Sequence, residues 1–159
     1  MKKIVFLAGV GLIIILCVSY LHFRTSVAAQ VGQETDVSQI QGRILSFFDA
    51  FMNNQPSSPD TYQSAYQKIF SGSLPQDSGS MVQETEKLIK SGTNWRYELL
   101  DTKPVGSDLI LIRYLCKSET HPVIWYFTFY RSPNTRNWNC LGIRFDTDYD
   151  SLFKENWPK

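Results

Sequence analysis

The stretch VIWYFTFY, residues 123–130, decides the fold of this 159-residue chain. Every residue in it is either aromatic or β-branched, and β-strands favour both types. Turn-forming residues bound it on both sides, in ETHP at residues 119–122 and in RSPN at residues 131–134. The stretch therefore predicts a strand that ends in a tight turn on each side.

Three further stretches predict strands around this one. Residues 94–99, NWRYEL, alternate apolar and polar side chains, which is typical of a strand with one wet face. Residues 109–116, LILIRYLC, are apolar at nearly every position, as expected of a central strand buried on both faces. Pro104 and Gly106 are expected to turn the chain between these two strands. With residues 138–145, WNCLGIRF, the four strands predict an antiparallel meander.

The predicted turns also set the register of the sheet. Paired residue numbers should sum to about 239 between the second and third strands, and to about 268 between the third and fourth. Cys116 then lies opposite Val123, and Cys140 lies opposite a residue near Thr128. Two cysteines in an oxidising compartment can form a disulfide. This register separates them by a strand and an offset of about five residues, so we expect both to be unpaired.

Three apolar stripes at helical spacing precede the strands. The first helix is expected to begin at Asp36 and to end before Asn53. The second begins at Ser58, a capping residue that Pro59 follows, and the third begins near Ser80. Helices followed by a meander predict an α+β fold. We expect three N-terminal helices packed on a curved four-stranded antiparallel meander sheet.

Only one face of the third strand can pack against the helices, because side chains alternate between the two faces. One possible set is Trp125, Phe127 and Phe129. The other is Ile124, Tyr126 and Tyr130. We expect the first set to pack against Phe47, Phe48 and Phe51 of the first helix. That set has no hydroxyl group that needs a partner, whereas tyrosines tolerate a wet outer face.

The N-terminus predicts a membrane segment. Lys2 and Lys3 precede an apolar run at residues 4–23, which is long enough to span a hydrocarbon core as a helix. Residues 27–29, Val-Ala-Ala, leave open a cleaved signal peptide, and Cys17 leaves open a lipoprotein. Lysines before the run favour a body outside the cytoplasm, periplasmic or at the cell surface, and secreted if the N-terminus is cleaved.

The predicted organisation is therefore a transmembrane anchor or signal peptide at residues 1–24, a tether at residues 25–35 and one domain at residues 36–159. The anchor contains three of the 16 basic residues, which leaves 13 against 15 acidic ones, a net charge of −2 for the exported part. That balance, with no basic stripe, argues against nucleic-acid binding.

The closing hairpin and the first helix carry a family resemblance. The helix ends in FFDAF, residues 47–51, and the hairpin joins WYFTFY, residues 125–130, to the Trp-led strand at residues 138–145. This order of elements over about residues 36–153 resembles the nuclear transport factor 2-like superfamily, which includes SnoaL-type cyclases and ketosteroid isomerase. The resemblance implies a cone-shaped α+β fold with a pocket between the first helix and the sheet. The short hairpin that the enzymes have between the second and third helices is missing here.

Few residues suggest catalysis. Acid–base chemistry in such a pocket needs a buried carboxylate and a donor. Tyr97, Tyr114 and Tyr126 are possible donors. The candidate carboxylates are less suitable, because Asp49 lies off the apolar stripe of its helix and Glu98 lies on a wet strand face. His121 sits in a turn, where a solvated role is expected. We therefore predict no catalytic residue.

Metal and phosphate sites are also not expected. One histidine and two cysteines outside the membrane segment are too few for a zinc site. The acidic run at residues 146–150 resembles the start of a calcium loop but lacks its required Gly and Glu. We predict no metal ion, no cofactor and no phosphate-binding loop.

Arg113 and Arg144 interrupt strongly apolar strands. A buried Arg needs a carboxylate or a ligand anion as its partner, whereas an Arg near a strand end can reach water. Both are included among the predicted pocket residues, which are Phe48, Phe51, Tyr62, Tyr66, Tyr97, Arg113, Trp125, Phe127, Phe129 and Arg144.

These observations favour a non-catalytic extracytoplasmic domain that binds a small apolar ligand or an envelope protein. One alternative is an assembly subunit of a membrane machine, since an N-terminal anchor with such a domain is similar to the inner-membrane bridging subunit of type IV secretion systems. Another is a SnoaL-like isomerase or cyclase. A ligand binder needs an apolar cavity, an assembly subunit an exposed apolar patch, and an enzyme a polar pair in its cavity.

Overall fold

The computed structural model describes residues 36–52, 58–71, 74–76, 78–135 and 137–148. The chain divides into two compact units, residues 1–41 and residues 42–159, and each is described by itself. In the first unit, the described residues 36–41 begin a helix. The second unit contains the rest of that helix and all the other described elements.

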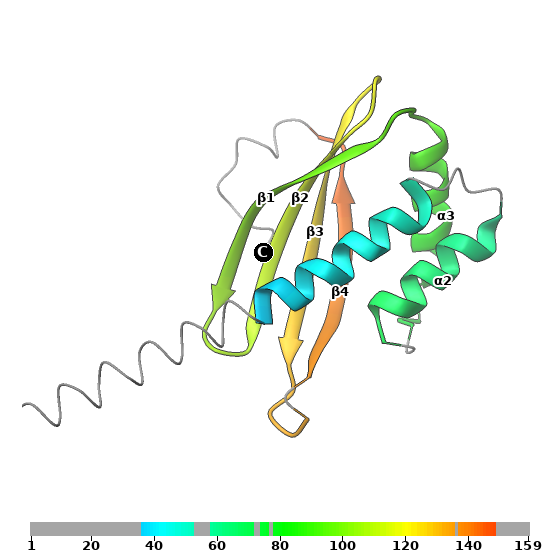
Figure 1. Ribbon diagram of the computed structural model, residues 1–159. Coiled ribbons are helices and arrows are strands. Elements are labelled where there is room, and N and C mark those ends of the chain that lie inside the picture. Colours follow the sequence, from blue (N-terminus) through cyan, green and yellow to red (C-terminus); the bar gives the residue numbers. More distant parts are fainter. Residues whose placement is uncertain (1–35, 53–57, 72–73, 77, 136, 149–159) are drawn as a thin grey trace, which may run out of the picture. The chain divides into compact units, whose positions relative to one another are not determined.

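The described residues have an α+β fold with three helices and a four-stranded antiparallel sheet, as predicted (Figure 1). The first helix spans residues 36–52. α2 spans Pro59–Ile69 and α3 spans Ser78–Lys90. The Ser58 side chain caps α2 by accepting a hydrogen bond of 3.2 Å from the backbone N–H of Asp60.

The four strands follow one another in the sheet in chain order, which makes the predicted meander (Figure 1). They are β1 at Arg96–Val105, β2 at Leu109–Lys117, β3 at Pro122–Arg131 and β4 at Trp138–Asp146. β1 and β4 are the two edges of the sheet.

The register of β2 against β3 is the predicted one, with Cys116 opposite Val123. The register of β3 against β4 differs by one residue from the loop onward, so that Cys140 pairs with Phe129. A β-bulge between Thr128 and Phe129 then shifts the pairing by one further residue. Both cysteines are free and buried, as expected from strands that do not neighbour each other.

Pro104 does not turn the chain, contrary to expectation. It lies within β1, opposite Ile110, and the turn falls at Gly106 with a φ of 68°. An edge strand tolerates proline because one row of its backbone N–H groups needs no partner in the sheet. The left-handed conformation at Gly106 is the one that favours glycine.

The inner face of the sheet, defined by Trp125 and Phe127, packs against the first helix. The rings of Phe47 and Phe48 lie 5.6 to 5.9 Å from those of Trp125 and Phe127. Phe51 lies 6.2 Å from Trp125. The predicted choice between the two faces of β3 is therefore confirmed.

The outer face differs from expectation in two ways. β2 is fully buried only at its inward positions, whereas Leu111 and Leu115 are half-buried, so the prediction of a strand buried on both faces was wrong. The prediction of a wet outer face for β3 was also wrong, because Ile124 and Tyr126 are 2% and 6% exposed. At Tyr126, the guanidinium of Arg144 stacks on the ring at 4.6 Å.

None of the described helices is long and apolar enough to cross a membrane. The predicted membrane segment at residues 4–23 and the tether at residues 25–35 lie outside the described residues.

Candidate functional site

Seven of the ten predicted pocket residues lie together in the interior, where they form an aromatic core with Phe47. The members of this aromatic core are Phe47, Phe48, Phe51, Tyr62, Tyr66, Trp125, Phe127 and Phe129. Each is at most 2% exposed. Contacting rings lie 4.9 to 6.3 Å apart, with many pairs edge to face. Most of the residues predicted to line a pocket thus pack against one another, and Phe129 packs against the guanidinium of Arg43.

Two polar atoms in the aromatic core lack hydrogen-bond partners. Four buried side-chain polar atoms have none among the described residues, and two of these, the Tyr62 hydroxyl and the Trp125 Nε1, belong to the core. Phe51 contacts both rings, at 5.6 and 6.2 Å. A buried donor without an acceptor costs roughly 1–3 kcal/mol. The two groups are therefore places where an acceptor on a ligand would stabilise the protein.

The Tyr66 hydroxyl, one turn further along α2, is satisfied. It lies 2.8 Å from the hydroxyl of Thr85 on α3, and both side chains are buried. Burial raises the pKa of Tyr66 to about 12. Burial, together with the charge of Glu86, also raises the pKa of Tyr62, so both hydroxyls stay protonated at neutral pH.

A polar pair lies at the rim of the aromatic core. The Tyr97 hydroxyl donates a hydrogen bond of 2.7 Å to Asp49 Oδ1, and the Tyr97 ring stacks on Phe48 at 5.1 Å. The hydrogen bond to Asp49 and partial burial raise the pKa of Tyr97 to about 12. Sequence reasoning missed this pair because Asp49 lies off the apolar stripe. The position of Asp49 next to the apolar Phe48 was the signal in the sequence that could have indicated this pair.

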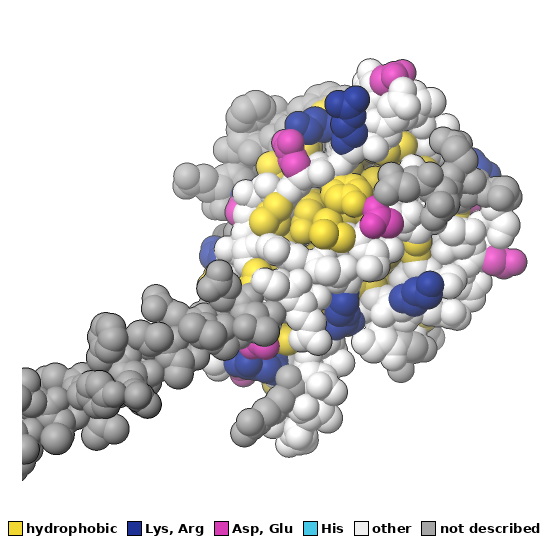
Figure 2. All heavy atoms as spheres, viewed as in Figure 1, with side chains coloured by type: hydrophobic (Ala, Val, Ile, Leu, Met, Phe, Trp, Pro, Cys, Tyr) yellow, Lys and Arg dark blue, Asp and Glu magenta, His cyan; other side chains and the backbone are white. Residues whose placement is uncertain are grey.

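Apolar side chains continue the rim on both edges of the sheet. Leu99 of β1, Trp125 of β3 and Phe145 of β4 belong to one cross-strand row that also contains Tyr114. Leu99 is 43% exposed, and Phe145 is half-buried with its ring 5.0 Å from Trp125. Figure 2 shows hydrophobic side chains gathered on the viewed face, with basic and acidic side chains at the border. We use the name rim cluster for four residues at the two edges of the sheet, with Asp49, Tyr97 and Leu99 on the β1 side and Phe145 on β4.

Arg113 and Arg144 do not join the other predicted pocket residues. They lie on the outer face, because each alternates along its strand with inward-facing residues. One cross-strand row places Asp101, Arg113, Tyr126 and Arg144 side by side across all four strands. Arg113 donates from Nε to both carboxylate oxygens of Asp101 at 3.0 Å, and this partner raises its pKa. Arg113 interrupts its apolar strand because it has a carboxylate partner, and not because it reaches water at a strand end.

A β-bulge explains why the Asp101 partner was not expected. The pairing of β1 with β2 shifts between Leu99 and Asp101, which adds one residue to β1. Strict alternation would place Asp101 on the same face as Leu99, whereas the bulge turns it to the outer face.

Arg43 of the first helix positions the aromatic core. Its guanidinium donates to the backbone carbonyl groups of Trp138 and Ile69, each at 2.5 Å, and stacks over Phe129 at 5.1 Å. Burial lowers the pKa of Arg43. These bonds tie the helix to β4 and to the end of α2. The sequence offered no signal for this role, because Arg43 lies beside the apolar stripe of an amphipathic helix.

His121 lies where two loops meet, and not at the aromatic core. Its Nδ1 is 2.8 Å from the Thr120 hydroxyl, and its Nε2 is 3.4 Å from the Ser91 hydroxyl. Within the described ranges, no three His, Cys, Asp or Glu side chains are grouped so as to hold a metal ion.

Comparison with known proteins supports the fold. No protein-family model matches the chain, and no curated protein matches it either. The chain is similar to a domain of unknown function with a cystatin-like fold from Nostoc punctiforme, whose crystal structure was determined at 2.00 Å resolution. The match has a TM-score of 0.50 and 14% sequence identity, and it covers 75% of this chain and 82% of the other. The likeness shows a cystatin-like fold.

Proposed function

We propose that this chain is a non-catalytic binding domain of the nuclear transport factor 2-like superfamily. The chain order of three helices and a four-stranded meander supports the family, and the cystatin-like fold of the similar structure is related to it. In this proposal the sheet curves around the first helix as a cone. Residues 4–23 hold the domain to a membrane, on the side away from the cytoplasm.

The proposed ligand is small and apolar and carries one hydrogen-bond acceptor. The observation that carries this proposal is the pair of buried donors in the aromatic core, Tyr62 OH and Trp125 Nε1. Ligand sites combine apolar walls with a few polar groups that fix the orientation of the ligand. The rings around these donors would supply such walls, and a carbonyl or ether oxygen would supply the acceptor.

The rim cluster gives such a ligand a way to approach the core. Leu99 offers exposed apolar surface, and the half-buried Phe145 lies against Trp125. At the rim, Asp49 and Tyr97 bond to each other and so present a satisfied polar edge. The ligand would displace the side chains at the rim to reach Trp125, so binding should be accompanied by ring movements of Phe145.

The test uses acetophenone, which has a carbonyl acceptor, and ethylbenzene, which has the same ring without one. In the full chain in detergent micelles, acetophenone should shift the indole N–H resonance of Trp125 in a saturable way, and ethylbenzene should shift it much less. The indole of Trp95 is the internal control, because it already donates to the Ile89 carbonyl at 3.1 Å. Trp125→Phe should abolish the preference for acetophenone.

A matched pair of surface variants tests the place of entry. Leu99→Asp should weaken binding of acetophenone, whereas Leu141→Asp should not, although Leu141 is more exposed at 57%. The proposal fails if acetophenone and ethylbenzene bind equally well, or if both Asp variants have the same effect.

An assembly subunit of a membrane machine is the second candidate. Leu99 and Leu100, which are neighbours on the edge strand β1, are 43% and 37% exposed, and exposed apolar side chains suit a protein partner. For this function, Leu100→Asp would prevent assembly in the native membrane while acetophenone binding stayed unchanged.

The third candidate is a SnoaL-like isomerase or cyclase, and the Asp49–Tyr97 pair is the observation in its favour. In this role the Tyr97 hydroxyl, whose pKa is about 12, would leave Asp49 and donate its hydrogen bond to a substrate carbonyl, and the released Asp49 would accept a proton. Asp49→Asn and Tyr97→Phe would then each abolish turnover without loss of fold.

A further inference from the structure

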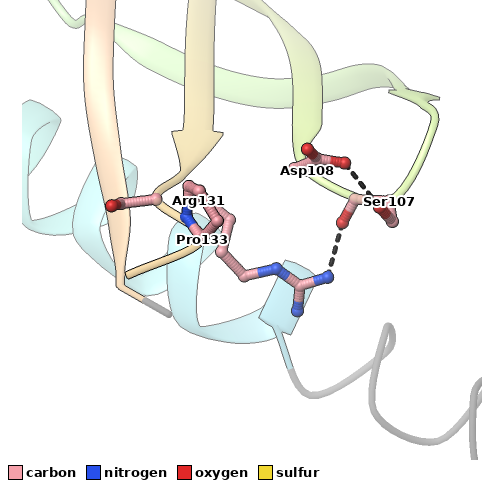
Figure 3. A pocket seen from close by; sticks show the side chains of 5 residues that line it. Ser107, Asp108, Arg131 and Pro133 are labelled. Atoms are coloured by element: carbon pink, nitrogen blue, oxygen red, sulfur yellow. Dashed lines mark hydrogen bonds between the residues drawn. The ribbon is translucent and has the colours of Figure 1, made fainter. Parts of the chain in front are cut away.

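A cavity lies between two hairpin turns at one end of the sheet. It has a volume of about 360 Å³, at the lower end of the range for small-molecule sites. Its lining comes from the β1–β2 turn and from the turn after β3, and consists of Ser107, Asp108, Arg131, Ser132 and Pro133 (Figure 3). Along β3 it is roughly 20 Å from Trp125, at about 3.3 Å per residue, so it is separate from the aromatic core.

The guanidinium of Arg131 is held in place on two sides. It donates a hydrogen bond of 2.5 Å to the Ser107 backbone carbonyl (Figure 3). It also stacks over the Trp138 ring at 5.1 Å. The Arg131 backbone N–H also donates to the Asp108 carbonyl at 2.7 Å, which joins the two turns. A guanidinium has five N–H donors in a planar fork that fits a carboxylate. Arg131 therefore brings a positioned cation to the cavity.

Asp108 brings the opposite charge to the same cavity. Its carboxylate accepts a hydrogen bond of 2.5 Å from the Ser107 hydroxyl, which orients it (Figure 3). Ser132 adds a hydroxyl group that can donate or accept, and Pro133 adds an apolar ring. The lining thus combines one acid, one base, two hydroxyl groups and a small apolar surface.

We propose that this cavity binds a small zwitterion, of the size of a free amino acid or a dipeptide. A simple anion would be attracted by Arg131 and repelled by Asp108, and a simple amine would be attracted by Asp108 and repelled by Arg131. A ligand with both charges is attracted by both side chains. Repulsion of the singly charged molecules supplies the specificity. The ligand carboxylate bonds Arg131, its ammonium bonds Asp108, and its side chain contacts Pro133.

The test compares leucine with two singly charged molecules of similar shape, isocaproate and isopentylamine. Each is added at millimolar concentration to the ¹⁵N-labelled full chain in detergent micelles, in a buffer free of amino acids and carboxylates. Leucine should shift the backbone amide resonances of Ser107, Asp108 and Ser132. Its affinity should exceed that of either singly charged molecule by at least about tenfold, and it should fall as salt is added.

Two variants assign the charges, and a third serves as control. Asp108→Asn should weaken leucine binding by about tenfold or more and should strengthen isocaproate binding, because the repelling charge is gone. Arg131→Gln should weaken both. Arg96→Gln, at the start of β1, should change neither.

Arg131 also bonds a backbone carbonyl, so Arg131→Gln can lower the melting temperature. Asp108→Asn separates binding from folding, since an amide oxygen still accepts the Ser107 hydrogen bond. The proposal is overturned if leucine leaves these resonances unmoved, if isopentylamine or isocaproate binds as well as leucine, or if folded Asp108→Asn binds leucine like the original chain.

Discussion

Tyr62 and Tyr66 lie one helical turn apart on α2, and both side chains are buried. Only the Tyr66 hydroxyl has a hydrogen-bond partner among the described residues, namely Thr85. Two tyrosines of the same helix therefore differ in one atom's surroundings, which makes them a matched pair for measuring what a buried hydroxyl contributes.

We predict opposite stability effects for the two Phe substitutions. Tyr66→Phe removes the hydrogen bond and leaves Thr85 buried without its partner, so it should lower the free energy of unfolding by roughly 1–3 kcal/mol. Tyr62→Phe removes a hydroxyl that has no partner, so stability should stay the same or rise slightly. Urea unfolding of both variants measures the difference. Equal destabilisation would mean that the Tyr62 hydroxyl is satisfied.

The thiols give a second prediction for single residues. Burial raises the pKa of Cys116 well above its ordinary value and, as the largest of several effects, raises that of Cys140 to about 12. Because the thiolate is the reactive form, both should react very slowly with a disulfide reagent in the native protein. After denaturation without reductant, all three cysteines of the chain should titrate. Loss of two thiols would reveal a disulfide and a wrong strand register.

At the scale of elements, residues 43–51 of the first helix are attached to the other elements of the second unit by two different interactions. The rings of Phe47, Phe48 and Phe51 pack on β3, and the guanidinium of Arg43 bonds carbonyl groups at the end of α2 and on β4. The rings supply most of the stabilisation, since burial of a Phe side chain contributes about 1.5–3 kcal/mol. The hydrogen bonds of Arg43 fix which part of the helix meets which strand.

The two faces of β3 should differ sharply in mutational cost. Phe127→Ala removes a fully buried ring from the aromatic core, so it should lower the free energy of unfolding by about 3–5 kcal/mol. Thr128→Ala, at the next position on the outer face, should cost less than about 1 kcal/mol. Phe48→Ala and Phe51→Ala should resemble Phe127→Ala. Thermal melts test the series, and a Phe127→Ala protein that melts like the original would contradict the core.

At the scale of the whole molecule, the proposed binding sites and the proposed membrane segment occupy different parts of the chain. The aromatic core and the cavity at Asp108 and Arg131, which we call the zwitterion cavity, are both formed by residues of the second unit, 42–159. The apolar run at residues 4–23 would determine on which side of a membrane these residues work.

We predict that residues 4–23 are retained in the mature protein. The run is about as long as a hydrocarbon core is thick, at about 1.5 Å per residue, and the small residues at 27–29 lie beyond Arg24. N-terminal sequencing of protein extracted from membranes should find the original start. A mature start near Ala29 would instead identify a cleaved signal peptide.

The sequence by itself determined the order of the elements, the β2–β3 register, the inner face of β3 and the absence of a bond between Cys116 and Cys140. Each follows from local signals, since turn residues, period-two alternation and helical spacing act over a few neighbouring residues.

Only the tertiary structure decided the rest. The bulges at Leu100 of β1 and Leu141 of β4 shift side chains to the opposite face, and sequence alternation contains no sign of them. The Asp49–Tyr97 hydrogen bond joins residues that are far apart in the chain. The burial of Tyr126 likewise depends on residues of other strands, such as Arg144. The zwitterion cavity exists because the meander brings the turn at Asp108 beside Arg131. Contacts of this kind depend on how the finished elements pack, and no short window of sequence specifies that.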